Sequence, residues 1–393
     1  MPERNSRTGD PVPLLKSLIR CPSVTPAAAG VLDVIEAAVM PLGFTVTRLS
    51  FEGDGSYAVD NLFASRGRGG KRLLFAGHTD VVPPGDAAAW SHDPFAAETA
   101  DGKIFGRGAA DMKSGIAAFI AALETVVASG AADSGTIALA ITNDEEADTV
   151  NGTAKLMAWA HEQGHRFDFA LVGEPSSTAV TGDSIKIGRR GSLNGWITVT
   201  GTQGHVAYPE RANNPLPIVA ALVGALYGME LDEGTEHFPP SNLEVTSIDV
   251  GNPTTNVIPE RGSIRFNIRF NDRWTPEALE TWIDQRIASI DAGGCAVRFE
   301  RVGAASRSFL SPAHHAIDLL DAVIAARIGK RPLHSTAGGT SDARFIAPYC
   351  PVVECGLPGP SMHQADEHVS IADVVALASL YAAFIEKYLG TAP

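Results

Sequence analysis

The sequence predicts an α/β domain with a mainly parallel central sheet, interrupted by a smaller α+β insert. In the first and last parts of the chain, short continuous apolar runs alternate with helical stretches, which is typical of strands buried on both faces of a helix-covered sheet. In the middle part, apolar and polar residues alternate along the strands, which indicates a sheet with one solvated face. A length of 393 residues also exceeds what one hydrophobic core usually serves.

The α/β domain is expected to comprise residues 1–186 and 303–393. Its strands are predicted from continuous apolar runs at Leu73–Gly77, Thr136–Thr142, Phe167–Gly173 and Pro351–Gly356. Its helices are predicted where apolar residues recur with a helical period, at Lys113–Ser129, His315–Ile328 and Ala372–Leu389. Gly130 ends the first of these helices.

The insert is expected to span residues 187–302. Its clearest strand is Ser263–Phe270, in which four apolar side chains alternate with Arg265, Asn267 and Arg269. Further strands are predicted near Gly191–Thr200, Leu243–Val250 and Cys295–Val302, and helices at Leu216–Leu231 and Pro276–Ala292, with Thr275 as the N-cap of the second. The resulting order, β-α-β-β-α-β, is that of a small ferredoxin-like sandwich.

Composition narrows the class of protein. The net charge of −14 disfavours a broad surface for nucleic acid or anionic membrane. The four cysteines are scattered without a CxxC pair, so free thiols in a reducing compartment are expected. The polar N-terminus lacks the apolar core of a signal peptide, and no apolar run reaches 18 residues. We therefore expect a soluble, cytoplasmic protein.

Several potential metal ligands lie in the segments where predicted strands give way to loops. They are His78 and Asp80 after LLFAG, Glu145 and Glu146 after TIALAIT, Glu174 after FDFALVG and His363 after PVVECG, while Asp111 ends GRGAAD before a helix. Taken singly, each has an ordinary explanation, such as a turn, a solvated acidic face or a helix N-cap. Because the carboxyl ends of parallel strands share one edge of a sheet, we expect these side chains to converge there.

The expected donors are imidazole and carboxylate without thiolate. That combination suits Zn²⁺, Co²⁺ or Mn²⁺ in a hydrolytic centre better than it suits a structural zinc cage. Two histidines and several carboxylates suffice for two ions bridged by one carboxylate, an arrangement that activates water and polarises a carbonyl.

Longer motifs identify a family. The segments GHTDVVPPGD, GRGAADMKSG, NDEEADTVNGT, GEPSS, GRRGS, GTQGHVAYPERANNP, NVIP and GGTSDARF resemble the M20 family of dizinc peptidases and deacylases over nearly the whole chain. The resemblance implies a zinc-peptidase-like catalytic domain, and it implies that the insert is a dimerisation or lid domain of a homodimer.

The resemblance also implies the ligands of two divalent ions, Zn²⁺ or alternatively Co²⁺. Asp111 would bridge them, with His78 and Glu174 on one ion and Glu146 and His363 on the other. His363 is chosen over His368 because the family places this ligand four residues before the position of Glu367.

Three further residues receive catalytic roles from the resemblance. Glu145 would be the general base, and Asp80 would accept a hydrogen bond from His78 and so orient it. His205 would reach from one subunit into the active site of its partner and stabilise the oxyanion.

The expected substrate is a small dicarboxylate. Among M20 reactions the motifs favour hydrolysis of N-succinyl-L,L-2,6-diaminopimelate to succinate and L,L-2,6-diaminopimelate, a step of lysine biosynthesis. The substrate-binding residues implied are Arg189, Arg190, Ser192, Tyr208, Asn256, Arg269, Gly339 and Thr340. Arginine suits this role because it pairs with carboxylates through two parallel hydrogen bonds.

Other functions stay open at this point. An acetylornithine-type deacetylase or a dipeptidase would share the metal ligands and differ in the acyl pocket. A non-catalytic metal- or substrate-binding relative would have no need of a free base at Glu145. A phosphate-binding enzyme is disfavoured because GxxxxGK[ST] is absent.

Overall fold

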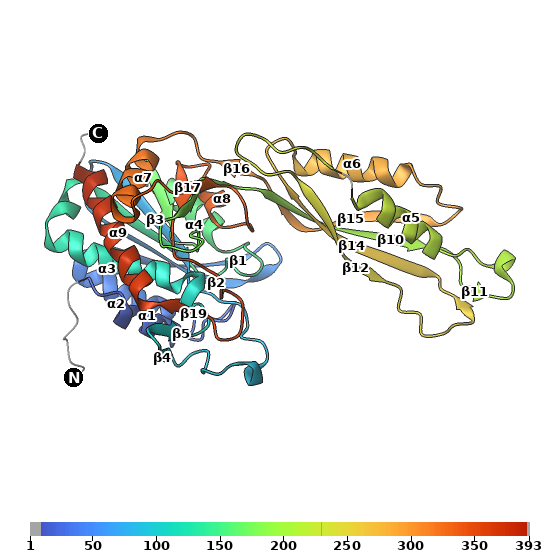
Figure 1. The fold of residues 1–393 in the computed structure, drawn as a ribbon, viewed down its shortest axis with the longest axis horizontal. Coiled ribbons are helices and arrows are strands. Elements are labelled where there is room, and N and C mark those ends of the chain that lie inside the picture. The colour runs from blue at the N-terminus through green and yellow to red at the C-terminus, as the bar shows by residue number, and fades with distance from the viewer. Residues whose placement is uncertain (1–8, 229, 391–393) are drawn as a thin grey trace. The chain divides into compact units, whose positions relative to one another are not determined.

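The computed structural model describes residues 9–228 and 230–390. The contacts within the chain divide it into two compact units (Figure 1). Unit 1 consists of Met1–Ile187, Ser311–Ser335 and Ser341–Pro393, and unit 2 consists of Gly188–Leu310 and Thr336–Thr340.

Unit 1 is built on an eight-stranded mixed sheet. In spatial order its strands are β1 (Thr45–Gly53), β2 (Ser56–Arg66), β6 (Thr136–Thr142), β3 (Arg72–His78), β7 (Phe169–Val172), β18 (Val352–Glu354), β8 (Ser184–Lys186) and β17 (Leu333–Ser335). The four central strands β6, β3, β7 and β18 are parallel to one another. Their carboxyl ends therefore lie along one edge of the sheet, as the sequence predicts.

Both faces of these central strands are buried, which explains their continuous apolar character. In β3, Leu73 and Phe75 belong to the large core on one face, and Leu74 is fully buried on the other. Phe75 stacks on Phe119 of a covering helix, with ring centroids 4.0 Å apart.

The helices of unit 1 are α1 (Val12–Ile19), α2 (Val31–Val39), α3 (Ser114–Ala128), α4 (Thr153–Glu162), α7 (His315–Ile328), α8 (Ala343–Ile346) and α9 (Ile371–Gly390). Helices α1, α2, α3, α7 and α9 contribute to the large core, in which α3 packs along α9 (Figure 1). Helix α4 packs against α8 and β6. A small sheet of β19 (His368–Ser370), β5 (Lys103–Phe105) and β4 (Thr99–Ala100) completes the unit.

Unit 2 is an antiparallel sheet covered by two helices. The strand order is β12 (Asn242–Asp249), β14 (Arg261–Phe270), β10 (Gly191–Thr200) and β15 (Ala296–Ser306), and the helices are α5 (Leu216–Leu226) and α6 (Pro276–Ala288). Both helices lie on the same face of the sheet (Figure 1). Along the chain the order is β-α-β-β-α-β, as expected for a ferredoxin-like sandwich.

The alternation predicted for β14 is confirmed. Ile264, Phe266, Ile268 and Phe270 are all at most 2% exposed and pack under the helices. Thr275 also acts as predicted, because its hydroxyl accepts the main-chain N–H of Ala278 at 3.2 Å, at the start of α6.

Two short strand pairs mark opposite ends of the unit 2 sheet. The first, β9 (Gly188–Arg189) with β16 (Phe309–Leu310), lies just before β10 begins. The second, β11 (Gly204–His205) with β13 (Val257–Ile258), lies just after β10 ends. Ten extended residues of β10 span about 33 Å, so residues beside the two pairs are far apart within one chain (Figure 1).

Element ends differ most from the predictions in unit 2. Helix α5 stops at Leu226 rather than 231, and α6 stops at Ala288 rather than 292. Strand β15 continues to Ser306, beyond the predicted domain boundary at 302, because it pairs with β10 as far as Ser192. Unit 2 therefore extends to Leu310 and also includes Thr336–Thr340, which the sequence prediction had assigned to the catalytic domain.

Within residues 9–228 and 230–390, no helix combines the length and apolar character needed to cross a membrane.

Candidate metal centre

The predicted ligands gather at the carboxyl ends of the central parallel strands. His78 is the last residue of β3, and Glu174 lies two residues beyond the end of β7. Glu146 follows β6 by four residues, and Asp111 lies in the short segment before α3. His363 comes from the loop between β18 and β19, where it adopts a left-handed φ of 61°.

The five side chains form one continuous series of contacts. His78 Nε2 lies 3.4 Å from Glu174 Oε1 and 3.2 Å from Asp111 Oδ1. His363 Nε2 lies 3.4 Å from Asp111 Oδ2 and 3.0 Å from Glu146 Oε1. Asp111 thus presents one oxygen to each histidine and lies at the middle of the series.

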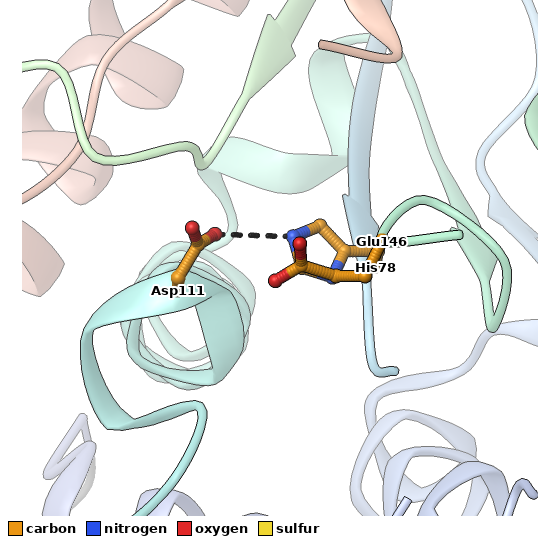
Figure 2. Close-up of side chains that lie close together, drawn as sticks. All are labelled: His78, Asp111 and Glu146. Carbon is orange, nitrogen blue, oxygen red and sulfur yellow. Dashed lines mark hydrogen bonds and ion pairs between the residues drawn. The ribbon is translucent and has the colours of Figure 1, made fainter. Parts of the chain in front are cut away.

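Two sets of potential ligand atoms are compact enough to surround an ion. In each of the sets His78–Asp111–Glu146 and His78–Glu145–Glu174, all donor atoms lie within 4.8 Å of one another. Figure 2 shows the first set, with Asp111 and His78 facing each other across the site. The second set includes Glu145, so this residue is a possible metal ligand as well as the predicted general base.

Close backbone packing brings Asp111 to this position. A Cβ at Gly115, at the start of α3, would collide with the main-chain carbonyl of Gly173, which precedes Glu174. A Cβ at Gly77 would likewise meet the side chain of Met112. These glycines let the start of α3 approach the ends of β3 and β7.

The tautomer of His78 follows from its neighbours. Nδ1 lies 3.0 Å from the main-chain oxygen of Asp80, which can only accept, so Nδ1 carries the hydrogen. Nε2 is therefore the ring nitrogen that faces Asp111 and Glu174 and that could bind an ion. The expected partner was the Asp80 carboxylate, but its nearest oxygen is 3.6 Å from Nδ1, so the carbonyl makes the hydrogen bond instead.

The Asp80 carboxylate binds the main chain of the loop that follows β6. It is fully buried and accepts the main-chain N–H groups of Glu145, at 3.1 Å, and Glu146, at 3.0 Å. The Thr25 hydroxyl donates to it at 2.8 Å. Asp80 therefore ties the loop after β6 to the end of β3.

The carboxylates of the site repel one another. Burial raises the pKa of Glu145 well above its usual value; the charge of His78 opposes this, and the charges of Glu174 and Asp342 add to it. Burial, followed by the charge of Asp111, raises the pKa of Glu174 to about 8. Removing carboxylates from water is costly unless positive charge compensates for it.

The pKa values of the two histidines are raised as well, in their case by the carboxylates around them. Burial would lower the pKa of His78, but the surrounding carboxylates of Asp111, Asp80 and Glu174 raise it well above its usual value. Hydrogen bonds with Asp111 and Glu146 raise the pKa of His363 to about 10. A cluster with these donors and this excess of negative charge fits divalent cations, whose charge would replace the protons.

Asp144, which the sequence motifs do not single out, supports the loop that contains Glu145 and Glu146. Asp144 accepts the hydroxyl of Tyr57 at 2.6 Å and the main-chain N–H groups of Thr149, Val150 and Asn151. The acidic run NDEE holds three successive carboxylates, and nothing in its local pattern distinguishes the one that folds back on the loop.

The predicted substrate-binding residues all lie in unit 2, where they form two groups. The first group is Arg189, Arg190, Ser192, Arg269, Gly339 and Thr340. Arg189 is 8% exposed and donates to the Gly339 carbonyl at 3.2 Å. Arg190 donates to Asn242 Oδ1 at 2.8 Å. Ser192 and Arg269 are directly opposite one another on β10 and β14.

The second group lies beyond the far end of β10. His205 belongs to β11, and its ring centroid is 5.7 Å from that of Tyr208. The Asn256 carbonyl accepts the N–H of Val206, which follows His205, at 3.2 Å. All three predicted residues of this group are exposed. Within unit 2, the length of β10 separates them from the group around Arg189.

Comparison with known proteins places this architecture in a family. The profile of peptidase family M20/M25/M40 matches residues 74–387. The chain belongs to that family. A related protein called succinyl-diaminopimelate desuccinylase, from Rhodospirillum centenum, is 51% identical to this M20 chain over 383 residues, covering 98% of each.

Solved structures share the M20 fold at low sequence identity. Aminopeptidase PepT from Bacillus cereus superposes with a TM-score of 0.78 at 19% identity, over 97% of this chain and 99% of its own. A Bacillus subtilis protein described as a dinuclear metal binding peptidase of the M20 family superposes with a TM-score of 0.68 at 14% identity, over 96% of each chain.

Proposed function

We propose that this chain is a metal-dependent amidohydrolase that converts N-succinyl-L,L-2,6-diaminopimelate to succinate and L,L-2,6-diaminopimelate. Family membership and 51% identity to a desuccinylase over 98% of both chains support this reaction. The observation that carries the proposal is the contact series Glu174–His78–Asp111–His363–Glu146, with Glu145 beside it.

We propose two Zn²⁺ ions as the metals, with Co²⁺ as the alternative. Asp111 would bridge them, His78 and Glu174 would bind one, and Glu146 and His363 would bind the other. The absence of thiolate from this donor set favours a hydrolytic rather than a structural centre. When bound, two such metal ions would polarise the carbonyl of the substrate and lower the pKa of a bound water.

Glu145 is proposed as the general base. Its carboxylate would accept a proton from the attacking water and deliver it to the leaving nitrogen. A base that works in both half-steps needs a pKa closer to neutral than that of a free carboxyl. Burial and neighbouring carboxylates raise the pKa of Glu145, which supports this role.

The arginine group is proposed to bind the carboxylates of the substrate. Arg189, Arg190 and Arg269 would supply positive charge, and Ser192, Gly339 and Thr340 would donate hydrogen bonds. Arg189 is held beside Gly339, so the guanidinium and the glycine backbone face the same region of unit 2.

We further propose a homodimer in which His205, Tyr208 and Asn256 act on the partner's substrate, His205 as the oxyanion donor. Separation of this group from the arginine group by the length of β10 supports action across subunits. Exposed residues on α5 form an apolar stripe without charge, at Pro217, Ala220, Ala221 and Gly224, which supports a contact surface in unit 2.

A substrate panel tests the proposed reaction. The purified chain, loaded with Zn²⁺, is assayed against N-succinyl-L,L-2,6-diaminopimelate, N-acetylornithine and dipeptides. We expect the highest kcat/KM for the succinylated substrate. A higher kcat/KM for either of the other classes would assign the chain to that activity instead.

A further inference from the structure

We infer that Glu367 is a positioning residue that holds the Asp111 segment and the His363 loop in the arrangement needed to bind the metal pair. Glu367 lies four residues after His363, immediately before β19. The inference rests on the proposed metal centre, and it adds a role for a side chain that has no place among the ligands or catalytic groups above.

The Glu367 carboxylate is saturated with donors from one segment. Oε1 accepts the main-chain N–H groups of Ala110, at 2.8 Å, and Asp111, at 3.2 Å. Oε2 accepts the N–H of Gly108 at 3.0 Å and Nη1 of Arg107 at 2.7 Å. The carboxylate is fully buried, so no water competes for these contacts.

Arg107 attaches the same segment to the His363 loop a second time. Its side chain is 3% exposed, and Nη1 also donates to the main-chain oxygen of Gln364, the residue after His363, at 3.3 Å. The guanidinium lies over the ring of Trp90, 5.2 Å from its centroid. The main-chain oxygen of Glu367 in turn accepts the N–H of Gly106 at 2.8 Å.

These contacts decide where the Asp111 carboxylate points. Its two oxygens face different histidines, at 3.2 Å and 3.4 Å, so a small rotation of the backbone at Asp111 would lose one of them. Glu367 accepts the N–H of Asp111 itself and comes from the loop that supplies one of those histidines. One side chain therefore sets the orientation of the bridging carboxylate relative to His363.

Replacing Glu367 by glutamine exchanges one acceptor oxygen for an NH₂ donor with little change in the shape of the side chain. A carboxylate accepts from all four donors, whereas an amide keeps one oxygen and turns an NH₂ group toward two of them. Glu367→Gln also leaves the buried Arg107 guanidinium without a charge partner. The double variant Arg107→Met/Glu367→Gln removes that unpaired charge while keeping the amide against the backbone N–H groups.

The test measures metal affinity without substrate. The full-length protein is freed of metal and titrated with Zn²⁺ in competition with a chromophoric chelator. For Glu367→Gln we expect at least one of the two sites to weaken by about 10- to 100-fold, the range typical of groups that orient ligands. The double variant should stay weak, whereas Arg107→Met alone should lose less affinity, because Glu367 keeps its three backbone donors.

A destabilised variant away from the site serves as the control. Ile35 is fully buried in α2, and Ile35→Ala should lower the midpoint of thermal unfolding while leaving Zn²⁺ affinity unchanged. Wild-type affinity in Glu367→Gln, recovery of affinity in the double variant, or an equal loss in Ile35→Ala would each overturn the inference. A wild-type protein that binds two ions but does not hydrolyse the succinylated substrate would refute the proposed reaction alone.

Discussion

Both carboxylate oxygens of Asp80 lie 3.1 Å from the main-chain nitrogen of Glu145. The end of β3, which supplies His78, is thereby connected to the loop that supplies the proposed base. The neighbouring Glu146 N–H is bound by the same carboxylate at 3.0 Å. A proposed ligand and the proposed base consequently depend on one buried acidic group for their relative positions.

Replacing Asp80 by asparagine should disturb both positions at once. The amide has one acceptor oxygen for the Glu145 and Glu146 N–H groups, and its own NH₂ would face one of them. We expect a loss of about 10- to 100-fold in metal affinity or kcat/KM. Steady-state kinetics and metal titration provide the measurements. Thr25→Val, which removes only the hydroxyl that donates to Asp80, is the milder companion variant, and an equal loss in both would contradict this account.

Replacing Glu145 by glutamine should separate chemistry from metal binding. Loss of a general base typically lowers kcat by about 10²- to 10⁴-fold, while the five proposed ligands are unchanged. Elemental analysis should still find two ions per chain, and kcat is measured with the succinylated substrate. Retained turnover would exclude Glu145 as the base. A loss of one ion would instead make Glu145 a ligand, as its place in the set with His78 and Glu174 permits.

Metal binding should release protons and strengthen as pH rises. Hydrogen bonds with Asp111 and Glu146 raise the pKa of His363 to about 10, so in the metal-free protein its imidazole is protonated at neutral pH. An imidazole binds a metal ion only when it is unprotonated, so binding displaces this proton throughout the range below about pH 10. Calorimetry in buffers of different ionisation enthalpy counts the protons released. Affinity that is independent of pH between 6 and 9 would contradict this expectation.

Mixing two inactive variants tests whether His205 acts across subunits. Glu145→Gln and His205→Ala homodimers should both have low activity. In a mixed dimer with action between subunits, one site combines an intact Glu145 with an intact His205 and the other has neither. Random exchange of equal amounts makes about half of the dimers mixed, so activity should recover toward about a quarter of wild type. If His205 acts within its own subunit, no site in the mixed dimer is intact and no recovery occurs.

The sequence alone determined which strands form the centre of unit 1 and where potential ligands follow them. Continuous apolar runs such as Thr136–Thr142 identify strands buried on both faces, and parallel strands must end at a common edge. That rule places His78, Glu146 and Glu174 near one another without knowledge of any contact. The alternation along β14 predicted its buried face for the same kind of reason, because a strand has a period of two residues.

Only the tertiary structure decided how these side chains face one another. The partner of His78 Nδ1 is a carbonyl rather than the expected carboxylate, and the Asp80 carboxylate is occupied by N–H groups from another loop. Glu367 likewise binds backbone groups more than 250 residues away in sequence. Hydrogen bonds between remote segments depend on distances and directions that arise after folding, and no local period or motif encodes them.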